Sequence, residues 1–353
     1  MSAYETFVPV NLLTGFLGSG KTTLLQRLLA APQMDGTAVL INEFGEVGLD
    51  HLLLEHLDEE TVILQSGCVC CTIRDDLSRA IRELLDKAEK GTIPPFDRLV
   101  IETTGLADPT PVVSTLMADP VLRHHVRLGN VVTTVDALNA ERHLAENPES
   151  VKQVAVADRL VLTKTDICDE DTAARARAVL KPLNPSAPLI EAASDEIDPD
   201  LLLGHDLVEP RSKSAEVQRW LSRDALSAHS HGSETDPNRH DLNRHDRGIQ
   251  AFALTFDKPL DWTAFGFWLT MLLHAHGDRV LRVKGILNVP DMETPVVIHG
   301  VQQVVHPPIH LERWPDADRR SRLVFIVRDL DRALIERSLA TFNRLAKPGR
   351  RAA

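Results

Sequence analysis

A glycine-rich segment near the N-terminus has the residue types and spacing that bind the phosphates of a nucleotide. Its sequence, GFLGSGKT at residues 15–22, fits the pattern G-x-x-x-x-G-K-[ST]. Glycines let the backbone curl so that successive N–H groups face one anion. Lys21 can then reach the β- and γ-phosphates, and the Thr22 hydroxyl can bind Mg²⁺. The expected phosphate-binding residues are Gly15, Gly18, Ser19, Gly20, Lys21, Thr22 and Thr23.

A second candidate for magnesium binding lies at the end of a short apolar run. Residues 98–102, RLVIE, are typical of a buried strand that ends in a carboxylate, and Gly105 follows shortly after. In proteins with such a phosphate loop, a carboxylate at a strand end helps to hold the metal. We therefore expect Lys21, Thr22 and Glu102 to act together in catalysis, with Glu102 binding Mg²⁺ through a water and the Gly105 N–H contacting a γ-phosphate. A plain surface carboxylate is the alternative.

Three cysteines are crowded into the segment GCVCC. Cys68, Cys70 and Cys71 could bring three thiolates to one cation, with Zn²⁺ the leading metal and Co²⁺ another. Three protein ligands leave a position open, which suits metal transfer, whereas the distant Cys168 is typical of a small, partly buried residue. Glu43 could add an oxygen ligand or contact Mg²⁺, or be a solvated loop acid. A structural zinc site and a redox pair of Cys68 and Cys71 remain alternatives.

Strands and helices must hold these segments in place, and the N-terminal part of the chain alternates between the two. Apolar, β-branched runs with little alternation are typical of strands buried on both faces. This order predicts an α/β fold with a mainly parallel sheet and right-handed crossovers. The expected strands lie at 7–13, 37–41, 61–65, 98–101, 131–135, 159–162 and 188–190, and the expected helices at 21–30, 74–90 and 169–180.

The composition changes after about residue 195, which marks the end of this domain. Residues 227–247 are polar and rich in histidine but have little periodicity, so we expect a loop with exposed histidines there. A smaller C-terminal α+β domain follows, which could bind another protein or mediate self-association. The expected strands lie at 249–256, 280–289, 296–299 and 323–327, the helices at 262–276 and 330–345, and the domains at 1–204, 205–248 (linker) and 249–346.

The overall composition narrows the classes of partner. Hydrophobic residues make up 43% of the 353 residues and charged residues 25%, as is ordinary for a globular protein. The formal net charge of -12 argues against nucleic acid and anionic membranes as partners. Neither a membrane-spanning run nor a secretory signal is visible, so we expect a cytoplasmic protein. In reducing cytosol, clustered cysteines favour metal or redox chemistry over disulfides.

In their order along the chain, these motifs resemble those of the CobW-like GTPase metallochaperones. The recurring elements of that family are a GFLGSGKTT-type loop, an EFG segment, a GCxCC motif, an ExxGL strand end and an NKxD-type base loop. The resemblance extends over most of the chain, and the ordered combination is far more specific than any single motif. The matching residues are 15–23, 43–45, 67–71, 102–106 and 163–166, with LRVKGIL at 281–287 in the second domain.

The resemblance assigns the segment TKTD to the recognition of guanine. Asp166 can accept two hydrogen bonds, from guanine N1–H and N2–H₂, a pair that adenine does not offer. The stem of Lys164 can cover the plane of the base. Thr163 stands where the family pattern has Asn, and its hydroxyl cannot copy both contacts of an amide. We expect guanine preference to persist through Asp166. A helix cap at Asp166 or Asp169 is the alternative.

The resemblance implies a GTPase with GTP and Mg²⁺ as its nucleotide and cofactor, which carries zinc on its cysteine motif to client metalloproteins. Because that motif lies between the loops after Ile41 and after Glu102, nucleotide state could alter its geometry. Glu43 and Asp108 are candidates for orienting the attacking water. Two rival interpretations are a small-molecule kinase, which would transfer phosphate to an acceptor, and a structural zinc protein that binds nucleotide only as a regulator.

Overall fold

The computed structural model describes residues 7–42, 62–65, 73–193, 197–203, 217 and 248–345. The chain divides into two compact units. The first unit comprises residues 1–180 and 187–207, and the second comprises 181–186 and 208–353.

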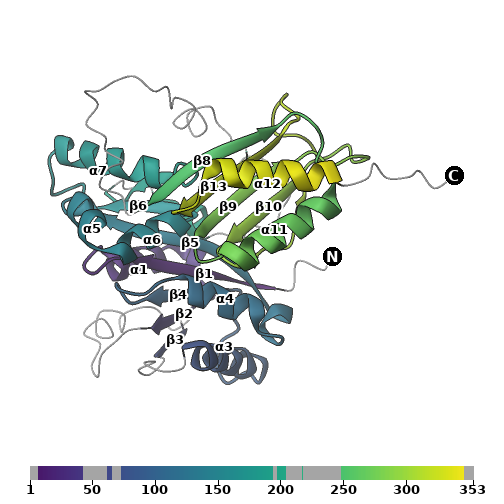
Figure 1. Cartoon of the computed structure of the whole chain (residues 1–353). Coiled ribbons are helices and arrows are strands. Elements are labelled where there is room, and N and C mark those ends of the chain that lie inside the picture. Colours follow the sequence, from purple (N-terminus) through teal and green to yellow (C-terminus); the bar gives the residue numbers. More distant parts are fainter. Residues whose placement is uncertain are drawn as a thin grey trace. The chain divides into compact units, whose positions relative to one another are not determined.

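The first unit is built on a seven-stranded parallel sheet (Figure 1). All its neighbouring strands pair in parallel, so the predicted α/β fold is confirmed. The apolar runs behave as expected for strands covered on both faces: every residue of β4 is buried. In spatial order the strands are β3 (Val62–Gln65), β2 (Thr37–Asn42), β4 (Arg98–Thr103), β1 (Val8–Gly15), β5 (Val126–Asp136), β6 (Arg159–Thr163) and β7 (Leu189–Glu191).

Helices connect these strands and cover the sheet. Leucines of α1 pack on one face with the last residues of α8, whereas α6 packs against β1 and β5. The sequence patterns indicated α1, α3 and α7 but not α4, α5, α6 or α8. A proline begins α6 and α8, and another precedes α4. The helices are α1 (Lys21–Leu29), α3 (Ile73–Glu89), α4 (Thr110–Ala118), α5 (Ala140–Glu146), α6 (Pro148–Val156), α7 (Glu170–Leu183) and α8 (Pro199–Leu203).

Strand register brings the carboxyl ends of the central strands together. Leu13 of β1 pairs with Glu102 of β4, and Gly15 pairs with Thr134 of β5. One strand further along, Asp136 pairs with Thr163 of β6. Because ligands of open parallel sheets bind outside the carboxyl ends of the strands, this edge is the expected location of a site.

Within residues 248–345, the second unit is an antiparallel sheet with two helices, as the α+β prediction required (Figure 1). One hydrophobic core joins α11, α12 and the strands, and it contains Phe265, Trp268 and Phe325. The sheet order is β11-β10-β9-β13-β8, with β12 paired to β10. The elements are β8 (Ile249–Phe256), α11 (Trp262–His276), β9 (Val280–Leu287), β10 (Val296–Val301), β11 (Val304–Val305), β12 (Ile309–His310), β13 (Ser321–Arg328) and α12 (Arg332–Leu345).

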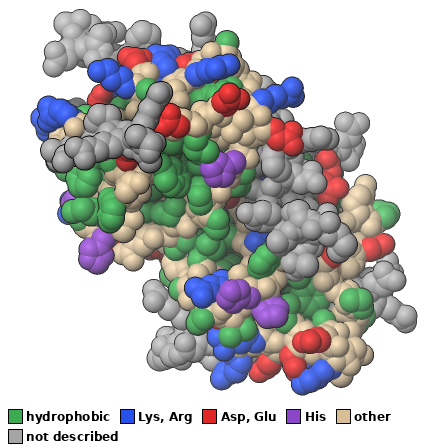
Figure 2. Space-filling view, turned by 90° about the vertical axis from the view of Figure 1, so that its right-hand side faces the viewer, with side chains coloured by type: hydrophobic (Ala, Val, Ile, Leu, Met, Phe, Trp, Pro, Cys, Tyr) green, Lys and Arg blue, Asp and Glu red, His purple; other side chains and the backbone are tan. Residues whose placement is uncertain are grey.

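Helix α11 is more exposed than its sequence pattern suggests. Phe265 and Trp268 are buried, but Trp262 is 41% exposed, and Phe267 and Met271 are more exposed still. Hydrophobic side chains are also visible on the face drawn in Figure 2, where Lys and Arg are interspersed with Asp and Glu. Among the residues that the structure describes, no helix has the length and apolar character needed to cross a bilayer.

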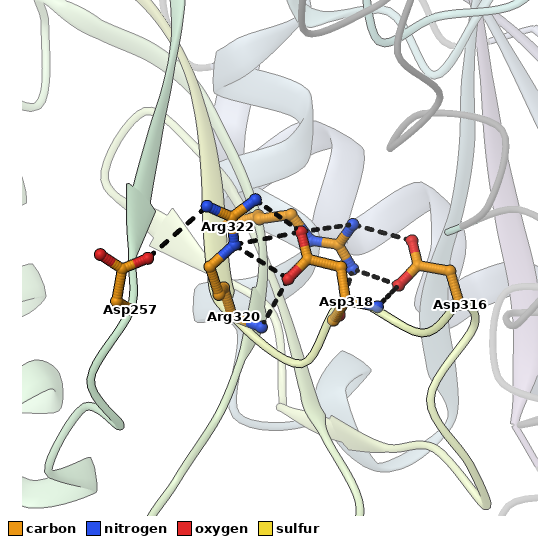
Figure 3. Close-up of polar contacts among 5 residues, drawn as sticks. All are labelled: Asp257, Asp316, Asp318, Arg320 and Arg322. Carbon is orange, nitrogen blue, oxygen red and sulfur yellow. Dashed lines mark hydrogen bonds and ion pairs between the residues drawn. The ribbon is translucent and has the colours of Figure 1, made fainter.

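An ion-pair network surrounds the start of β13 (Figure 3). Arg322 is buried and makes two hydrogen bonds to the Asp316 carboxylate, of 2.8 and 3.0 Å. Arg320 binds Asp318 through Nε at 3.0 Å and Nη2 at 2.9 Å, and it lies 3.5 Å from Asp257. Paired carboxylates of this kind let a guanidinium be buried in the sheet without an unpaired charge.

Candidate nucleotide site

The phosphate loop leaves β1 at a position where only glycine fits. The φ angle of Gly15 is 142°, and a Cβ there would lie 2.3 Å from the Thr134 hydroxyl and 2.5 Å from its carbonyl oxygen. The loop ends at Gly20, the N-cap of α1, which makes no side-chain capping bond. The N–H groups of the first helical turn therefore point out of the helix end and, with the helix dipole, form a site for an anion.

Side chains of the loop are held close to this anion site. The Lys21 ammonium donates to the carbonyl oxygens of Gly15 at 3.1 Å and Phe16 at 3.3 Å. The buried hydroxyl of Ser19 lies 2.6 Å from that of Thr134 on β5. The predicted lysine is thus positioned at the mouth of the loop, and Thr134, which the motif does not mark, joins the loop to the neighbouring strand.

Thr22 and Glu102 meet at the expected magnesium position. The Thr22 hydroxyl donates a 2.8 Å hydrogen bond to Glu102 Oε1, although the two residues are 80 positions apart in the chain. Glu102 is only 5% exposed. A hydroxyl oxygen and a carboxylate beside a phosphate site are the hard oxygen ligands that Mg²⁺ prefers, so the residues present fit this ion.

The loop between β4 and α4 packs directly on the phosphate loop. A Cβ on Gly105 would lie 2.6 Å from the Leu17 backbone nitrogen, so only glycine permits this approach. Asp108, a predicted candidate for orienting water, accepts hydrogen bonds from the Thr110 N–H and the Lys152 ammonium, each at 3.0 Å. Burial acts to raise the pKa of Asp108, but these hydrogen bonds outweigh it and the pKa is lowered. Asp108 therefore acts as an anchor of this loop.

The predicted base loop is tied to its surroundings by two side chains. The buried Thr163 hydroxyl bonds to the carbonyl oxygens of Ser19 at 2.8 Å and Val135 at 3.1 Å. Lys164 has a φ of 62°, which is uncommon outside glycine, and its ammonium lies 2.7 Å from Asp136 Oδ2. Asp166 is exposed at the end of the loop. Thr163 and Lys164 thus fix the start of the loop, while Asp166, the residue predicted to recognise guanine, is exposed.

Asp136 is a residue that sequence reasoning missed. It is 2% exposed and also accepts hydrogen bonds from Asn139 Nδ2 at 2.8 Å and the Leu138 N–H at 2.9 Å. Burial acts to raise the pKa of Asp136, but the hydrogen bond from Lys164 and these others lower it on balance. Its signal in the sequence is the one that identified Glu102: a carboxylate directly after a buried strand.

His143 of α5 was also not anticipated. Its ring lies 4.7 Å from that of Phe16 in the phosphate loop, and the two residues help to line a small pocket behind the loop. Burial lowers the pKa of His143, so the neutral imidazole is favoured beside Phe16.

The predicted metal-binding residues Cys68, Cys70, Cys71 and Glu43 lie outside the described residues. The segment that carries the cysteines leaves β3 at Gln65 and re-enters the described structure in α3 at Ile73. Within the described ranges, no group of three or more His, Cys, Asp or Glu side chains is arranged to hold a metal ion. Cys168 is half-buried as expected, with its sulfur 3.9 Å from the Thr165 carbonyl oxygen.

The fold and site define a nucleotide-binding protein with a phosphate loop, extended by a separate α+β unit. Comparison with known families agrees. The model of the CobW/HypB/UreG nucleotide-binding domain matches residues 9–191, and that of the cobalamin synthesis protein cobW C-terminal domain matches residues 249–343. The chain therefore belongs to the CobW/HypB/UreG family, and the predicted family resemblance is confirmed.

Individual relatives cover nearly the whole chain. The zinc chaperone YjiA of Escherichia coli is 33% identical over 90% of this chain and 93% of its own length. The zinc-regulated GTPase metalloprotein activator 1 of Schizosaccharomyces pombe is 32% identical over 84% of this chain and 76% of its own. The crystal structure of Zn(II)-bound YjiA GTPase from E. coli matches with a TM-score of 0.69 at 29% identity, covering 95% of this chain and 99% of that one.

Proposed function

We propose that this chain is a GTP-hydrolysing metal chaperone that binds a metal ion, zinc foremost, at Cys68, Cys70 and Cys71 and transfers it to client metalloproteins. The proposed binding and hydrolysis of the nucleotide rest on one observation: Lys21, Thr22 and Glu102 lie together at one edge of the sheet. The zinc half is supported by relatives that are themselves named zinc chaperones or zinc-regulated GTPases.

In the proposed hydrolysis, separate groups of residues bind the phosphates, the Mg²⁺ ion and the base. Backbone N–H groups of the phosphate loop and the Lys21 ammonium bind the β- and γ-phosphates. The Thr22 hydroxyl would hold Mg²⁺ directly, and Glu102 would hold it through a water. The ion would neutralise the charge that develops on the phosphates. The Gly105 N–H contacts the γ-phosphate, and Asp166 selects guanine.

Strand order supports a link between nucleotide and cargo. The cysteine segment begins after β3, and β3, β2, β4 and β1 are successive neighbours in one parallel sheet. Three strand spacings separate β3 from β1, or about 14 Å. Both segments therefore start from the same edge, within reach of a loop rearrangement. Bound GTP would change the geometry of the three thiolates, and linkage then requires zinc to change GTP affinity by the same factor.

A combined measurement of turnover and metal binding tests this function. Reduced protein is assayed with GTP, ATP and candidate acceptors for phosphate release, and zinc is titrated into the nucleotide-free and GTP-analogue-bound forms. We expect GTP-selective hydrolysis, and zinc affinities that differ between the two forms. Acceptor-dependent phosphotransfer without guanine preference would support a kinase instead. Equal zinc affinities in the nucleotide-free and GTP-analogue-bound forms would show that nucleotide does not control zinc binding. The protein would then still be a GTPase.

The same family assignment bears on location and domain roles. We propose that the protein acts in the cytoplasm, where reduced thiols are available for metal transfer. Its GTPase domain spans residues 1–204, and the C-terminal domain at 249–346 recognises the client or mediates self-association. Pull-down of metal-requiring proteins with and without residues 249–346 tests the second assignment.

A further inference from the structure

One glutamine of α6 holds the loop that follows β4. Gln153 is fully buried, and its side-chain Nε2 donates two hydrogen bonds, to the Gly105 carbonyl oxygen at 3.1 Å and to the Ala107 carbonyl oxygen at 3.0 Å. A primary amide has two N–H donors, so both are used on this loop. If the amide were flipped, its oxygen would point toward two carbonyl oxygens, which are also acceptors. The two carbonyl groups therefore determine the orientation of the amide.

The amide oxygen of the same side chain makes this arrangement costly. Gln153 Oε1 is buried without a hydrogen-bond partner among the described residues. A buried acceptor without a partner is uncommon in folded proteins, because it loses its hydration and gains nothing in return. An apolar side chain would avoid this cost, but it would leave the Gly105 and Ala107 carbonyl oxygens without these two donors. The retained amide therefore points to a role for its two donors.

The glutamine is itself held by strand β5 next to the phosphate loop. Its backbone carbonyl oxygen accepts a 2.9 Å hydrogen bond from the Thr133 hydroxyl. The next residue of β5, Thr134, is the one whose hydroxyl meets Ser19 of the phosphate loop. The neighbouring Lys152 binds Asp108 further along the β4–α4 loop. One turn of α6 thus fixes that loop relative to β5 and the phosphate loop.

We propose that Gln153 is a positioning residue that holds the Gly105 N–H toward the γ-phosphate, and so sets the preference for GTP over GDP. The proposal rests on the proposed GTPase function. The two carbonyl groups that Gln153 binds lie on either side of the Leu106 residue, so fixing both restricts rotation of the Gly105 backbone. The contact of Gly105 with Leu17 then fixes the distance of this N–H from the phosphate loop.

The isosteric change Gln153→Glu tests the proposal. An ionised carboxylate has no donor and would face both carbonyl oxygens, which should displace the loop. We expect kcat for GTP hydrolysis and the affinity ratio of a GTP analogue to GDP to fall at least about tenfold each, with GDP affinity nearly unchanged. Gln33→Glu, the same change at an exposed residue, is the matched control and should behave as wild type.

A pH profile separates positioning from a general loss of folding. A buried carboxyl has a raised pKa, and when protonated it regains one O–H donor. The losses of kcat and of GTP preference in Gln153→Glu should therefore become smaller as the pH falls from about 8 to about 6. In the wild-type protein neither quantity should improve over this range. Gln153→Met, which is uncharged, serves if the glutamate variant does not fold and should show the same loss of GTP preference at all pH values.

Two outcomes would overturn the proposal. One is wild-type kcat and wild-type GTP preference in both variants. The other is an equal loss of affinity for GDP and for the GTP analogue, which would indicate structural damage alone. Failure of the proposed function is distinguishable, because the wild-type protein itself would then show no GTP turnover.

Discussion

The Thr163 hydroxyl donates a 2.8 Å hydrogen bond to the carbonyl oxygen of Ser19, across 144 residues of sequence. This contact joins the predicted base loop to the phosphate loop, so the two halves of the nucleotide site are held at a fixed separation. The family pattern has an asparagine where Thr163 stands. Here the short hydroxyl is used for contact between the loops, and the proposed recognition of guanine rests on Asp166.

Removing that hydroxyl should weaken nucleotide binding uniformly. Thr163→Val keeps the shape of the side chain but leaves the buried Ser19 carbonyl oxygen without this donor. The hydrogen bond also exists in the nucleotide-free protein, so its full value of about 1 kcal/mol sets an upper limit of roughly fivefold on the loss of binding, through looser positioning of the two loops. Because the contact exists before and after hydrolysis, GDP and a GTP analogue should lose affinity equally, with kcat little changed. Fluorescent-nucleotide titration measures this, and Thr163→Ser, which keeps the hydroxyl, is the control.

The exposed carboxylate of Asp166 predicts a change of base preference. Asp166→Asn replaces an acceptor pair with one acceptor and one donor, so guanine loses a hydrogen bond while xanthine, which carries a carbonyl at C2, gains a donor. We expect GTP affinity to fall by about a hundredfold, as for loss of charge-assisted hydrogen bonds, and xanthosine triphosphate to become the better substrate. Competition between the two nucleotides measures it. An unaltered preference for GTP would mean that another residue reads the base.

The sequence was sufficient to predict those parts of the fold that depend on local pattern. Apolar runs located the parallel strands, and the strand-end carboxylate located Glu102, which the register places beside Leu13 of β1. The phosphate loop was predictable because its backbone geometry requires glycines at fixed spacing. Asp136 follows the same strand-end rule and could have been found by it.

Contacts that depend on packing between distant segments could not be predicted. Gln153 lies in α6, a short helix that begins at a proline and gave no clear pattern. Its importance comes from two carbonyl oxygens almost fifty residues away, and nothing in the identity of either partner signals the pairing. Asp108 is one of two predicted candidates for orienting water, and its contacts with Thr110 and Lys152 were not predicted. A carboxylate in a loop has too many possible partners for sequence alone to choose one.

A substitution in the cysteine motif should weaken metal binding without weakening nucleotide binding. Cys70→Ser replaces a thiolate with a weakly coordinating hydroxyl, so zinc affinity should fall by about a hundredfold or more, while GDP affinity stays at the wild-type value. Cys168→Ser is the matched control, since Cys168 is a half-buried cysteine beside the base loop, and it should retain full zinc binding. Zinc titration against a chromophoric chelator measures both. If Cys168→Ser lost zinc binding while Cys70→Ser retained it, the cysteine motif would not be the zinc site.

The ion-pair network of the second unit predicts how its stability depends on acid (Figure 3). Hydrogen bonds from Arg320 lower the pKa of Asp318 to about 2, despite an opposing effect of burial. An unfolded chain has an aspartate pKa near 3.9, so the folded state binds protons less readily. The stabilisation is therefore complete above the unfolded pKa and is lost as pH falls from about 4 toward about 2.

Asp318→Asn should remove that part of the acid dependence. The variant is expected to unfold at a lower temperature than wild type at pH 7, by a few degrees, because Arg320 loses a charged partner. The difference should narrow as pH falls through 4 toward 2, since wild type then protonates Asp318 and approaches the state of the variant. Asp257→Asn is the control, because Asp257 is largely exposed and lies 3.5 Å from Arg320. A difference that stays constant down to pH 2 would mean that the Asp318 charge contributes nothing.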